Sequence, residues 1–188
     1  MQKIGAQIQL DKSKEELIVE IHPNISDKNK LILNAWLLLW TACGLAVVSQ
    51  LFVDSYAFEE KVFMLIYLAF WAYLEFKVLY AFRWNRKGIE RIELKDGKFA
   101  YTKLIGKRGL PFECEWNDLS LFHYESSTET GLWNDINKAA WMVGGEVIEY
   151  KFKHKIRRLG MKLNKKDALK LVDQLNRFIQ SKRQNAPK

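Results

Sequence analysis

The side chains in this sequence that are best suited to chemistry are cations near its C-terminal end. In the stretch Glu149 to Gly160, EYKFKHKIRRLG, basic residues alternate with others at the period of two that is typical of a half-buried strand. One predicted face carries Tyr150, Phe152, His154 and Ile156, and the other carries Lys151, Lys153, Lys155 and Arg157. Four positive charges on one face could contact an anionic membrane or nucleic acid, or could face only water.

A second basic group lies in GKRG, Gly106 to Gly109. Its Lys107 and Arg108, with Lys103 before them, could meet a phosphate group. The whole chain of 188 residues carries a net charge of +8, which favours anionic partners. We predict lipid or anion contact at these three residues and at the 151–157 stripe, which is Lys151, Lys153, Lys155 and Arg157.

The cations have two other interpretations. They could form a solvated face, or an edge strand that its lysines protect from pairing with other chains. They could also attract nucleic acid, but no recognition-helix motif, RNP-like aromatic pair or zinc-finger spacing accompanies them. We therefore expect membrane lipid as a partner and no nucleic acid.

Catalytic chemistry has little support in the sequence. His22, His123 and His154 are scattered, and no metalloprotease, serine-hydrolase, P-loop or dinucleotide-binding motif is present. The two cysteines, Cys43 and Cys114, are too few for a four-ligand zinc site. A Cys–His enzyme would need Cys114 and His123 to face each other across strands, and nothing in the sequence suggests this. We expect a non-enzymatic protein with no catalytic residues, no metal and no cofactor.

Two long apolar runs dominate the first half of the chain. Leu31 to Val53 has no charged side chain, and Val62 to Phe82 carries only Glu75 and Lys77. At a rise of about 1.5 Å per residue, either run would cross a hydrocarbon core of roughly 30 Å. Neither shows the polar stripe of a surface helix in a small soluble domain. We predict a transmembrane helical hairpin, 31–53 and 62–82, rather than two core helices.

Charge and aromatic residues orient this hairpin. Basic residues lie on both outer flanks and the connecting turn is mainly acidic, which predicts that both termini are cytoplasmic. The flanking cations are Lys28, Lys30, Arg83, Arg86, Lys87 and Arg91, and the turn holds Asp54, Glu59 and Glu60 against Lys61. The expected anchors at the membrane surface are Trp36, Arg83, Trp84, Arg86 and Lys87. In a bacterium the membrane would be the inner, cytoplasmic membrane.

Two features inside the hairpin could serve packing or function. Glu75 and Lys77 are ionisable groups in an apolar helix, and such groups often mark an ion or proton path. Glu75 lies toward the cytoplasmic end, so structural pairing or snorkelling to the interface is the main alternative. Ala42, Gly44 and Ala46 form a small-residue face for close packing, either within the hairpin or between copies of the chain.

The remaining sequence predicts an antiparallel β domain. Asp96-Gly97 is the residue pair of a type I′ hairpin turn. Alternating residues predict two short strands before the helices, around 8–10 and 17–21, which we expect to join the later sheet. The strands predicted after the Asp96-Gly97 hairpin are 110–116, 119–125, 140–143, 147–152 and 155–163.

A helix is predicted to close the β domain. Asn164 caps it, Asp167 completes a capping box, and apolar residues recur at helical spacing over 165–181. The polar segment 126–138 is predicted to be a long loop whose Trp133 tucks back or meets a partner. The predicted organisation is 1–29, N-terminal strands joining the soluble domain; 30–83, the hairpin; 84–183, the β domain; and 184–188, a disordered tail.

The order of these elements resembles the bacterial membrane-anchored pleckstrin-homology-like (PH-like) proteins. The resemblance covers Leu17 to Ile179 and rests on EELIVEIHPN, RWNRKGIERIELKDGKFAYTKLIG and GEVIEYKFKHKIRRLGMKLNKKDALKLVDQLNRFI. It implies an α+β membrane protein with a two-helix transmembrane hairpin and a seven-stranded antiparallel β-barrel or sandwich capped by a C-terminal helix. The chain departs from the family at residues 1–14 and in the longer 126–138 loop. The resemblance implies fold and topology rather than an activity.

Three functions follow as hypotheses. In the first, the protein is a scaffold or accessory subunit of a membrane assembly or homo-oligomer, and the sheet or the Trp133 loop contacts a protein partner. In the second, it is an anionic-lipid-sensing domain that docks through the basic strand. In the third, it is an accessory subunit of a transport system that uses Glu75.

Ionic strength separates the first two hypotheses. Lipid contact through exposed cations should fade as salt rises, because charges further apart than a Debye length are screened, whereas an apolar protein interface should persist. A stripe that binds lipid should also lose its lipid preference when its four cations are replaced by glutamine. Binding to anionic vesicles over a salt series measures both effects, and binding that salt leaves unchanged would contradict the lipid hypothesis.

Overall fold

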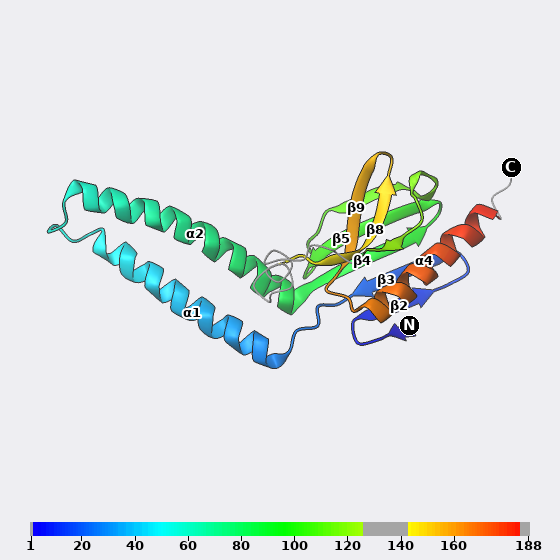
Figure 1. Ribbon diagram of the computed structural model, residues 1–188, viewed down its shortest axis with the longest axis horizontal. Helices are drawn as coiled ribbons and strands as arrows, with labels where there is room; N and C mark the ends of the chain where they lie inside the picture. The colour runs from blue at the N-terminus through cyan, green and yellow to red at the C-terminus, as the bar shows by residue number, and fades with distance from the viewer. Residues whose placement is uncertain (1, 126–142, 185–188) are drawn as a thin grey trace.

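The computed structural model describes residues 2–125 and 143–184 of the chain. Two long helices, α1 (Asp27–Gln50) and α2 (Phe58–Lys87), lie side by side and project from one end of the strands (Figure 1). The C-terminal helix α4 (Lys165–Gln184) packs against the strands, and its C-terminal end points away from α1 and α2. The described residues therefore form an α+β fold with three α-helices and antiparallel sheets.

The strands form two separate sheets. The larger has the order β1-β2-β3-β4-β5-β6, and the smaller has the order β7-β8-β9. Their bounds are β1 Gln2–Ile4, β2 Ile8–Lys12, β3 Glu16–Ile21, β4 Gly88–Lys95, β5 Lys98–Ile105, β6 Pro111–Glu115, β7 His123–Tyr124, β8 Glu146–Phe152 and β9 Lys155–Met161. Every pairing within both sheets is antiparallel.

The sheets are not closed into a barrel, so the expectation of a barrel is wrong for the described strands. The edge strand β6 is short and begins at Pro111, which has no N–H to donate to a further ladder. It meets the second sheet through side chains instead, with the rings of Phe112 and Phe152 at 5.2 Å between centroids. The predicted strand 119–125 is also reduced to the two residues of β7, with an isolated bridge from Leu119 to Phe152.

The two long helices are inserted between neighbouring strands of one sheet. β3 comes before α1 and β4 follows α2, yet they pair directly, with Leu17 opposite Leu94 and Val19 opposite Ile92. These four side chains are fully buried, so the ladder is fixed by core packing as well as by backbone hydrogen bonds. The N-terminal strands and the strands after the helices therefore share one sheet.

Both helices begin before the apolar runs, because polar groups cap them. Ser26 Oγ accepts from the Asn29 N–H at 3.3 Å at the start of α1, and a Glu60 oxygen accepts from the Ala57 N–H at 2.8 Å at the start of α2. Helix α1 ends at Gln50, three residues before the predicted end at Val53. Helix α2 continues past Phe82 to Lys87 and runs into β4 without a loop.

The long helices are apolar and largely uncovered. Each is long and apolar enough to cross a membrane, with a mean hydropathy of 2.1 for the best stretch of α1 and 1.7 for that of α2. Only 11% of either stretch is buried within the protein. The helices do not form a soluble core, because side chains such as Leu38, Phe63 and Phe70 are more than half exposed.

One hydrophobic core unites both sheets and α4. The rings of Phe99, Phe122 and Tyr150 meet at centroid distances of 5.3 to 5.8 Å and join β5 to the second sheet. Helix α4 packs against β1, β7 and β8. Its predicted cap is confirmed, since Asn164 Oδ1 accepts from the Asp167 N–H at 2.8 Å. The buried residues of α4 include Leu171, Leu175, Phe178 and Ile179.

The predicted Asp96-Gly97 turn is confirmed, with positive φ at both residues between β4 and β5. The predicted segment 126–138 with Trp133 lies outside the described residues. So does most of the predicted strand 140–143, and its last residue, Val143, has no regular secondary structure.

Gly88, the first residue of β4, is predicted to be required at the helix–strand junction. A Cβ there would overlap the Trp84 carbonyl oxygen, which accepts the Gly88 N–H, and the Trp84 ring. Gly88→Ala should lower the free energy of unfolding by about 1–3 kcal/mol, the usual cost of overpacking. Thermal unfolding in detergent, followed by circular dichroism, measures the change. Lys87→Ala changes an exposed neighbour and is the control; equal stability of the two variants would contradict the prediction.

Candidate functional site at the base of the helical hairpin

The end of α2 and the turn between β5 and β6 bring two groups of predicted cations together. The Gly106 N–H donates to the Lys87 carbonyl at 2.9 Å, which ties the turn to the end of the helix. Ile105 and Arg108 exchange backbone hydrogen bonds of 2.9 and 3.3 Å, which close the turn. The cations gathered here, the basal cations, are Arg83, Arg86 and Lys87 from α2 and Lys107 and Arg108 from the turn.

An open groove of about 820 Å³ lies between α2 and this turn. Its apolar lining comes mainly from Phe76, Leu79 and Tyr80 on the helix and from Leu110 after the turn. The Leu110 side chain is 93% exposed. Arg83, Lys107 and Arg108 also line this groove, and the same three cations line a neighbouring groove of about 370 Å³ that includes Arg86 and Lys87. The main groove is therefore apolar with a basic margin.

The basal cations have no acidic partners among the described residues. Within the described residues, none of the five makes an ion pair, and Arg86 instead lies over the Phe82 ring at 4.8 Å from its centroid. Lys103 lines the groove too, but its Nζ is 2.7 Å from Glu146 Oε1. The positive potential of the groove therefore comes mainly from Arg83, Lys107 and Arg108, and an anion there would meet uncompensated charge.

The 151–157 stripe is not one face of one strand, so that part of the sequence interpretation is wrong. The chain reverses at Lys153, which has a φ of 53°, and β8 pairs with β9. Tyr150 is opposite Arg157 and Lys151 is opposite Ile156, so Lys151 and Arg157 lie on different faces of the hairpin. The guanidinium of Arg157 lies over the Phe112 ring at 3.8 Å from its centroid. The four cations are exposed, but they do not share one face of the β8–β9 hairpin.

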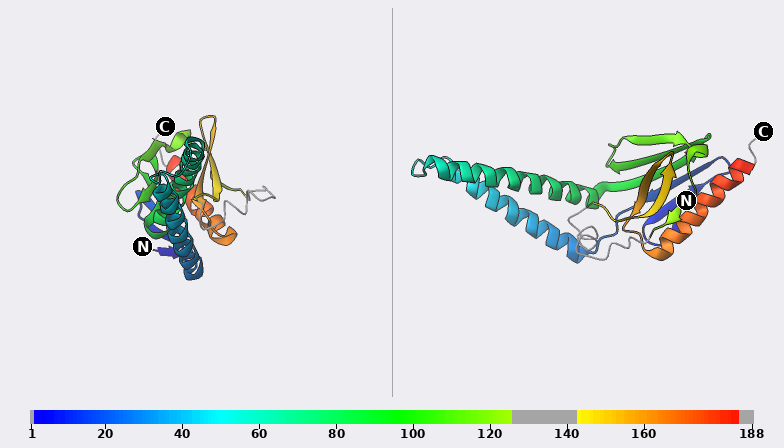
Figure 2. Two further views of the ribbon diagram at one scale, coloured as in Figure 1. Left: turned by 90° about the vertical axis from the view of Figure 1, so that its left-hand side faces the viewer. Right: turned by 45° about the horizontal axis from the view of Figure 1, so that its top comes forward.

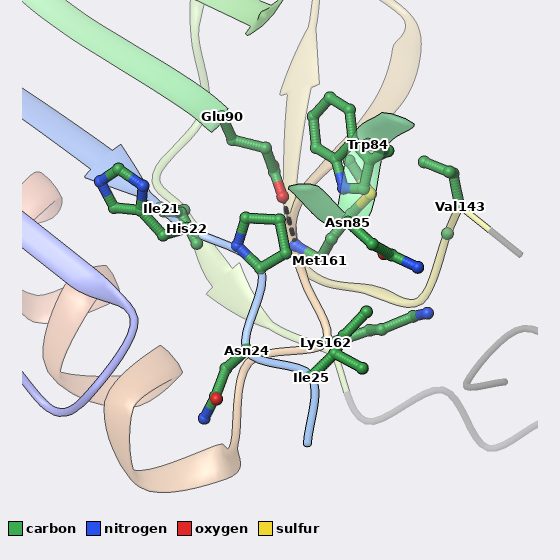
Figure 3. Close-up of a pocket in the computed structure, with 12 residues that line it drawn as sticks. Ile21, His22, Asn24, Ile25, Trp84, Asn85, Glu90, Val143, Met161 and Lys162 are labelled. Atoms are coloured by element: carbon green, nitrogen blue, oxygen red, sulfur yellow. Dashed lines mark hydrogen bonds between the residues drawn. The ribbon is translucent and has the colours of Figure 1, made fainter. Parts of the chain in front are cut away.

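A buried carboxylate lies beside the junction of α2 with the sheet. Glu90 is 1% exposed and takes an inward position of β4, in register with Ile92 and Leu94. Its carboxylate accepts from the Met161 N–H at 2.6 Å (Figure 3) and from the Gly160 N–H at 2.9 Å, and both residues lie in β9. Glu90 therefore links the two sheets at a position where the alternation of β4 would otherwise place an apolar side chain.

The surroundings of Glu90 perturb its ionisation. Burial raises the pKa of Glu90 above its ordinary value, and the bonds from Met161, Tyr101 and Gly160 only partly oppose this. The Tyr101 hydroxyl donates to the carboxylate at 2.8 Å. Burial, and then the nearby Glu90, raise the pKa of Tyr101 as well. The cavity that adjoins Glu90 has a volume of about 20 Å³, which is room for about one water.

Inside the hairpin, Glu75 pairs with a hydroxyl of the other helix. Thr41 Oγ1 donates to Glu75 Oε1 at 2.7 Å, while the second, buried oxygen of Glu75 has no hydrogen-bond partner among the described residues. Nearby, the Trp71 Nε1–H donates to the Trp40 carbonyl at 3.0 Å. Gly44 is buried, and a Cβ there would overlap the Trp71 ring. These contacts hold α1 against α2.

Other predicted residues lie elsewhere. Ala42 and Ala46 are exposed, so only Gly44 of the small-residue face packs within the hairpin. Lys77 is exposed, with its Nζ 5.6 Å from the centroid of the Tyr73 ring. Trp36 is 38% exposed and stacks on Trp40. Trp84, expected at the membrane surface, is only 4% exposed, because it packs inward at the start of β4.

The described residues offer little for catalysis or metal binding. No three His, Cys, Asp or Glu side chains in the described part of the chain are grouped to hold a metal ion. Cys114 lies in β6 and His123 in β7, in different sheets. Burial raises the pKa of the Cys114 thiol to about 11, which is the opposite of what a reactive thiolate needs.

Sequence reasoning missed Glu90 and Leu110. Glu90, Ile92 and Leu94 are spaced two residues apart, and this alternation was the signal that could have placed Glu90 on the buried face. Leu110 had no comparable signal, because its importance arises from the turn that lies beside α2.

A scan against protein-family models finds no match for this chain, and no curated protein matches it.

Glu90 is predicted to be required for the link between the sheets. In Glu90→Gln, an amide NH₂ would face N–H or O–H donors, leaving buried groups unsatisfied. The free energy of unfolding should fall by about 2 kcal/mol or more. Glu93→Gln is the matched control, since Glu93 is a half-exposed residue of the same strand that pairs with Arg91, and it should change stability by about 0.5 kcal/mol. Chemical denaturation in detergent measures both, and equal losses would contradict the assignment.

The same variant tests the pKa of Glu90. The folded pKa is raised above the ordinary value of 4.5, so the stabilising contribution of the proton is complete below about pH 4.5 and lost as pH rises through the folded pKa. The stability of the wild type relative to Glu90→Gln should therefore fall as pH is raised from that value. Denaturation curves over a pH series give the difference. A relative stability that rises with pH would show that the hydrogen bonds outweigh burial.

Proposed function

We propose that this protein is a non-enzymatic integral membrane protein, in which α1 and α2 cross a bilayer and the α+β domain is an interaction module at the membrane surface. The observation that carries this proposal is the insertion of two uncovered apolar helices between β3 and β4. Because β3 and β4 pair directly, the helices enter and leave the sheet at neighbouring positions. A bilayer would cover their apolar side chains and hold the domain beside its surface.

The alternative of a soluble protein leaves a large apolar surface in water. Soluble monomers seldom expose continuous apolar patches larger than a few hundred Å². Both helices project away from the strands (Figure 2, right), and exposed apolar side chains occur along them from Leu31 to Tyr80. Lipid contact removes this cost without requiring a protein partner for the whole hairpin.

The charge distribution supports a cytoplasmic domain in the bacterial inner membrane. The basal cations lie where α2 meets the domain, whereas Asp54, Glu59 and Glu60 lie at the opposite turn. The positive-inside rule assigns the basic end to the cytoplasm. Two spans return the chain to the side from which it started, so both termini are cytoplasmic.

The domain itself suits docking better than chemistry. The groove at the base of the hairpin is an open recess of the domain that would lie beside the membrane. We propose that it acts as a scaffold or accessory subunit of a membrane assembly. The exposed face of α1 that carries Ala42 and Ala46 is available to a second copy or to lipid.

The topology is testable with single cysteines in a Cys43→Ala, Cys114→Ala background. Ser55 lies in the exposed turn between the helices, and Lys98 is the exposed first residue of β5, so the two labelling sites are Ser55→Cys and Lys98→Cys. In intact cells, a membrane-impermeant maleimide should label position 55, and it should label position 98 only after the cytoplasm is opened. The protein should also stay in the membrane during carbonate washing. Labelling of both positions in intact cells, or release by carbonate, would contradict the proposal.

A further inference from the structure

We infer that the main groove at the base of the hairpin seats one anionic phospholipid of the cytoplasmic leaflet. The inference rests on the proposed function, because it needs α2 to lie in a bilayer. The phosphate would lie between Arg83, Lys107 and Arg108, and an acyl chain would lie along the apolar wall of α2.

The order of residues along α2 matches the order of groups along a phospholipid. Phe76, Leu79, Tyr80 and Arg83 follow one another at i, i+3, i+4 and i+7, which places them on one face of the helix. Arg83 lies about 10 Å from Phe76 along the axis. The apolar wall therefore faces the depth of the acyl chains, and the cation lies nearer the domain, where the head groups are.

The opposite wall of the groove supplies the same two kinds of contact. Lys107 and Arg108 are exposed on a turn fixed by backbone hydrogen bonds to Ile105 and Lys87, so both cations are held close to Arg83. Leu110 follows them and is 93% exposed, although it is apolar. A lipid chain or the leaflet itself would cover Leu110, whereas a free phosphate would leave it in water.

Charge identifies the lipid class. Arg83, Lys107 and Arg108 make no ion pairs within the described residues, and Lys103, the fourth cation of the groove, is held by Glu146. An anionic head group would neutralise them with charge-assisted hydrogen bonds, which guanidinium and phosphate form well. A zwitterionic head group brings its own cation, so it would satisfy the groove less well.

The test compares two variants with equal loss of charge. The groove variant carries Arg83→Gln, Lys107→Gln and Arg108→Gln. The control, the β8–β9 variant, carries Lys151→Gln, Lys153→Gln and Lys155→Gln. All six side chains are exposed and make no ion pair among the described residues. The full chain is purified in mild detergent, titrated with phosphatidylglycerol or phosphatidylcholine, and examined by native mass spectrometry to count retained lipids. Circular dichroism checks that each variant is folded.

The wild type and the β8–β9 variant should retain one phosphatidylglycerol in preference to phosphatidylcholine. The groove variant should bind it at least about fivefold more weakly, the change expected from losing one contact of about 1 kcal/mol. Equal weakening in the two variants would overturn the inference, since it would reflect net charge alone, and so would an unchanged groove variant. If the groove variant fails to fold, Leu110→Gln replaces it. That substitution should also weaken retention, and unchanged retention would overturn the inference.

The two proposals fail in different ways. Release of the wild type from membranes by carbonate would contradict the membrane-spanning hairpin, and the lipid inference would fall with it. A wild type that needs detergent for extraction but shows no preference for phosphatidylglycerol would overturn the lipid inference alone.

Discussion

The ladder between β3 and β4 is the constraint on which the rest of the structure depends. It pairs strands that are separated in the chain by the whole helical hairpin, and it continues to Ile21 opposite Glu90, beside the points where the helices leave the sheet. The entropic cost of closing a loop grows only slowly with the length of the loop, so a long insertion is compatible with a stable sheet. Because α2 also enters β4 without a loop, the direction of the helix is tied to the direction of the strand.

The Glu90 carboxylate extends this constraint to the second sheet. It lies where α2, β4 and the end of β9 meet, and its bonds to Gly160 and Met161 join β9 to the helix-bearing sheet. Burying a carboxylate opposes stability, and three donors compensate for part of that cost. A buried polar link has geometric requirements that an apolar contact lacks, which suits a position where two sheets and a helix must keep a fixed arrangement.

Residue patterns predicted the local elements well and the assembly less well. The uncharged run from Leu31 and the Asp96-Gly97 pair each specify structure through nearby residues, so the helices and the β4–β5 turn were predictable. The interpretation of 151–157 as one face was wrong, because a period of two continues through the reversal at Lys153 without changing in the sequence. The separately predicted strands 147–152 and 155–163 match β8 and β9. The groove was only partly predictable: its cations could be named, but their meeting with Leu79 and Leu110 depends on how the turn folds back onto α2.

In the proposed function, the helical hairpin, its junction with the sheet and the basic, apolar groove form one docking surface. This function requires that the turn after β5 lies at the membrane surface. Spin labels at Leu110→Cys and Lys98→Cys, in a cysteine-free background reconstituted in phosphatidylglycerol-containing bilayers, test this directly by power saturation. The account predicts that the label at 110 is reached mainly by oxygen dissolved in the lipid, and the label at 98 mainly by an aqueous nickel reagent. Equal aqueous exposure of both labels would contradict it.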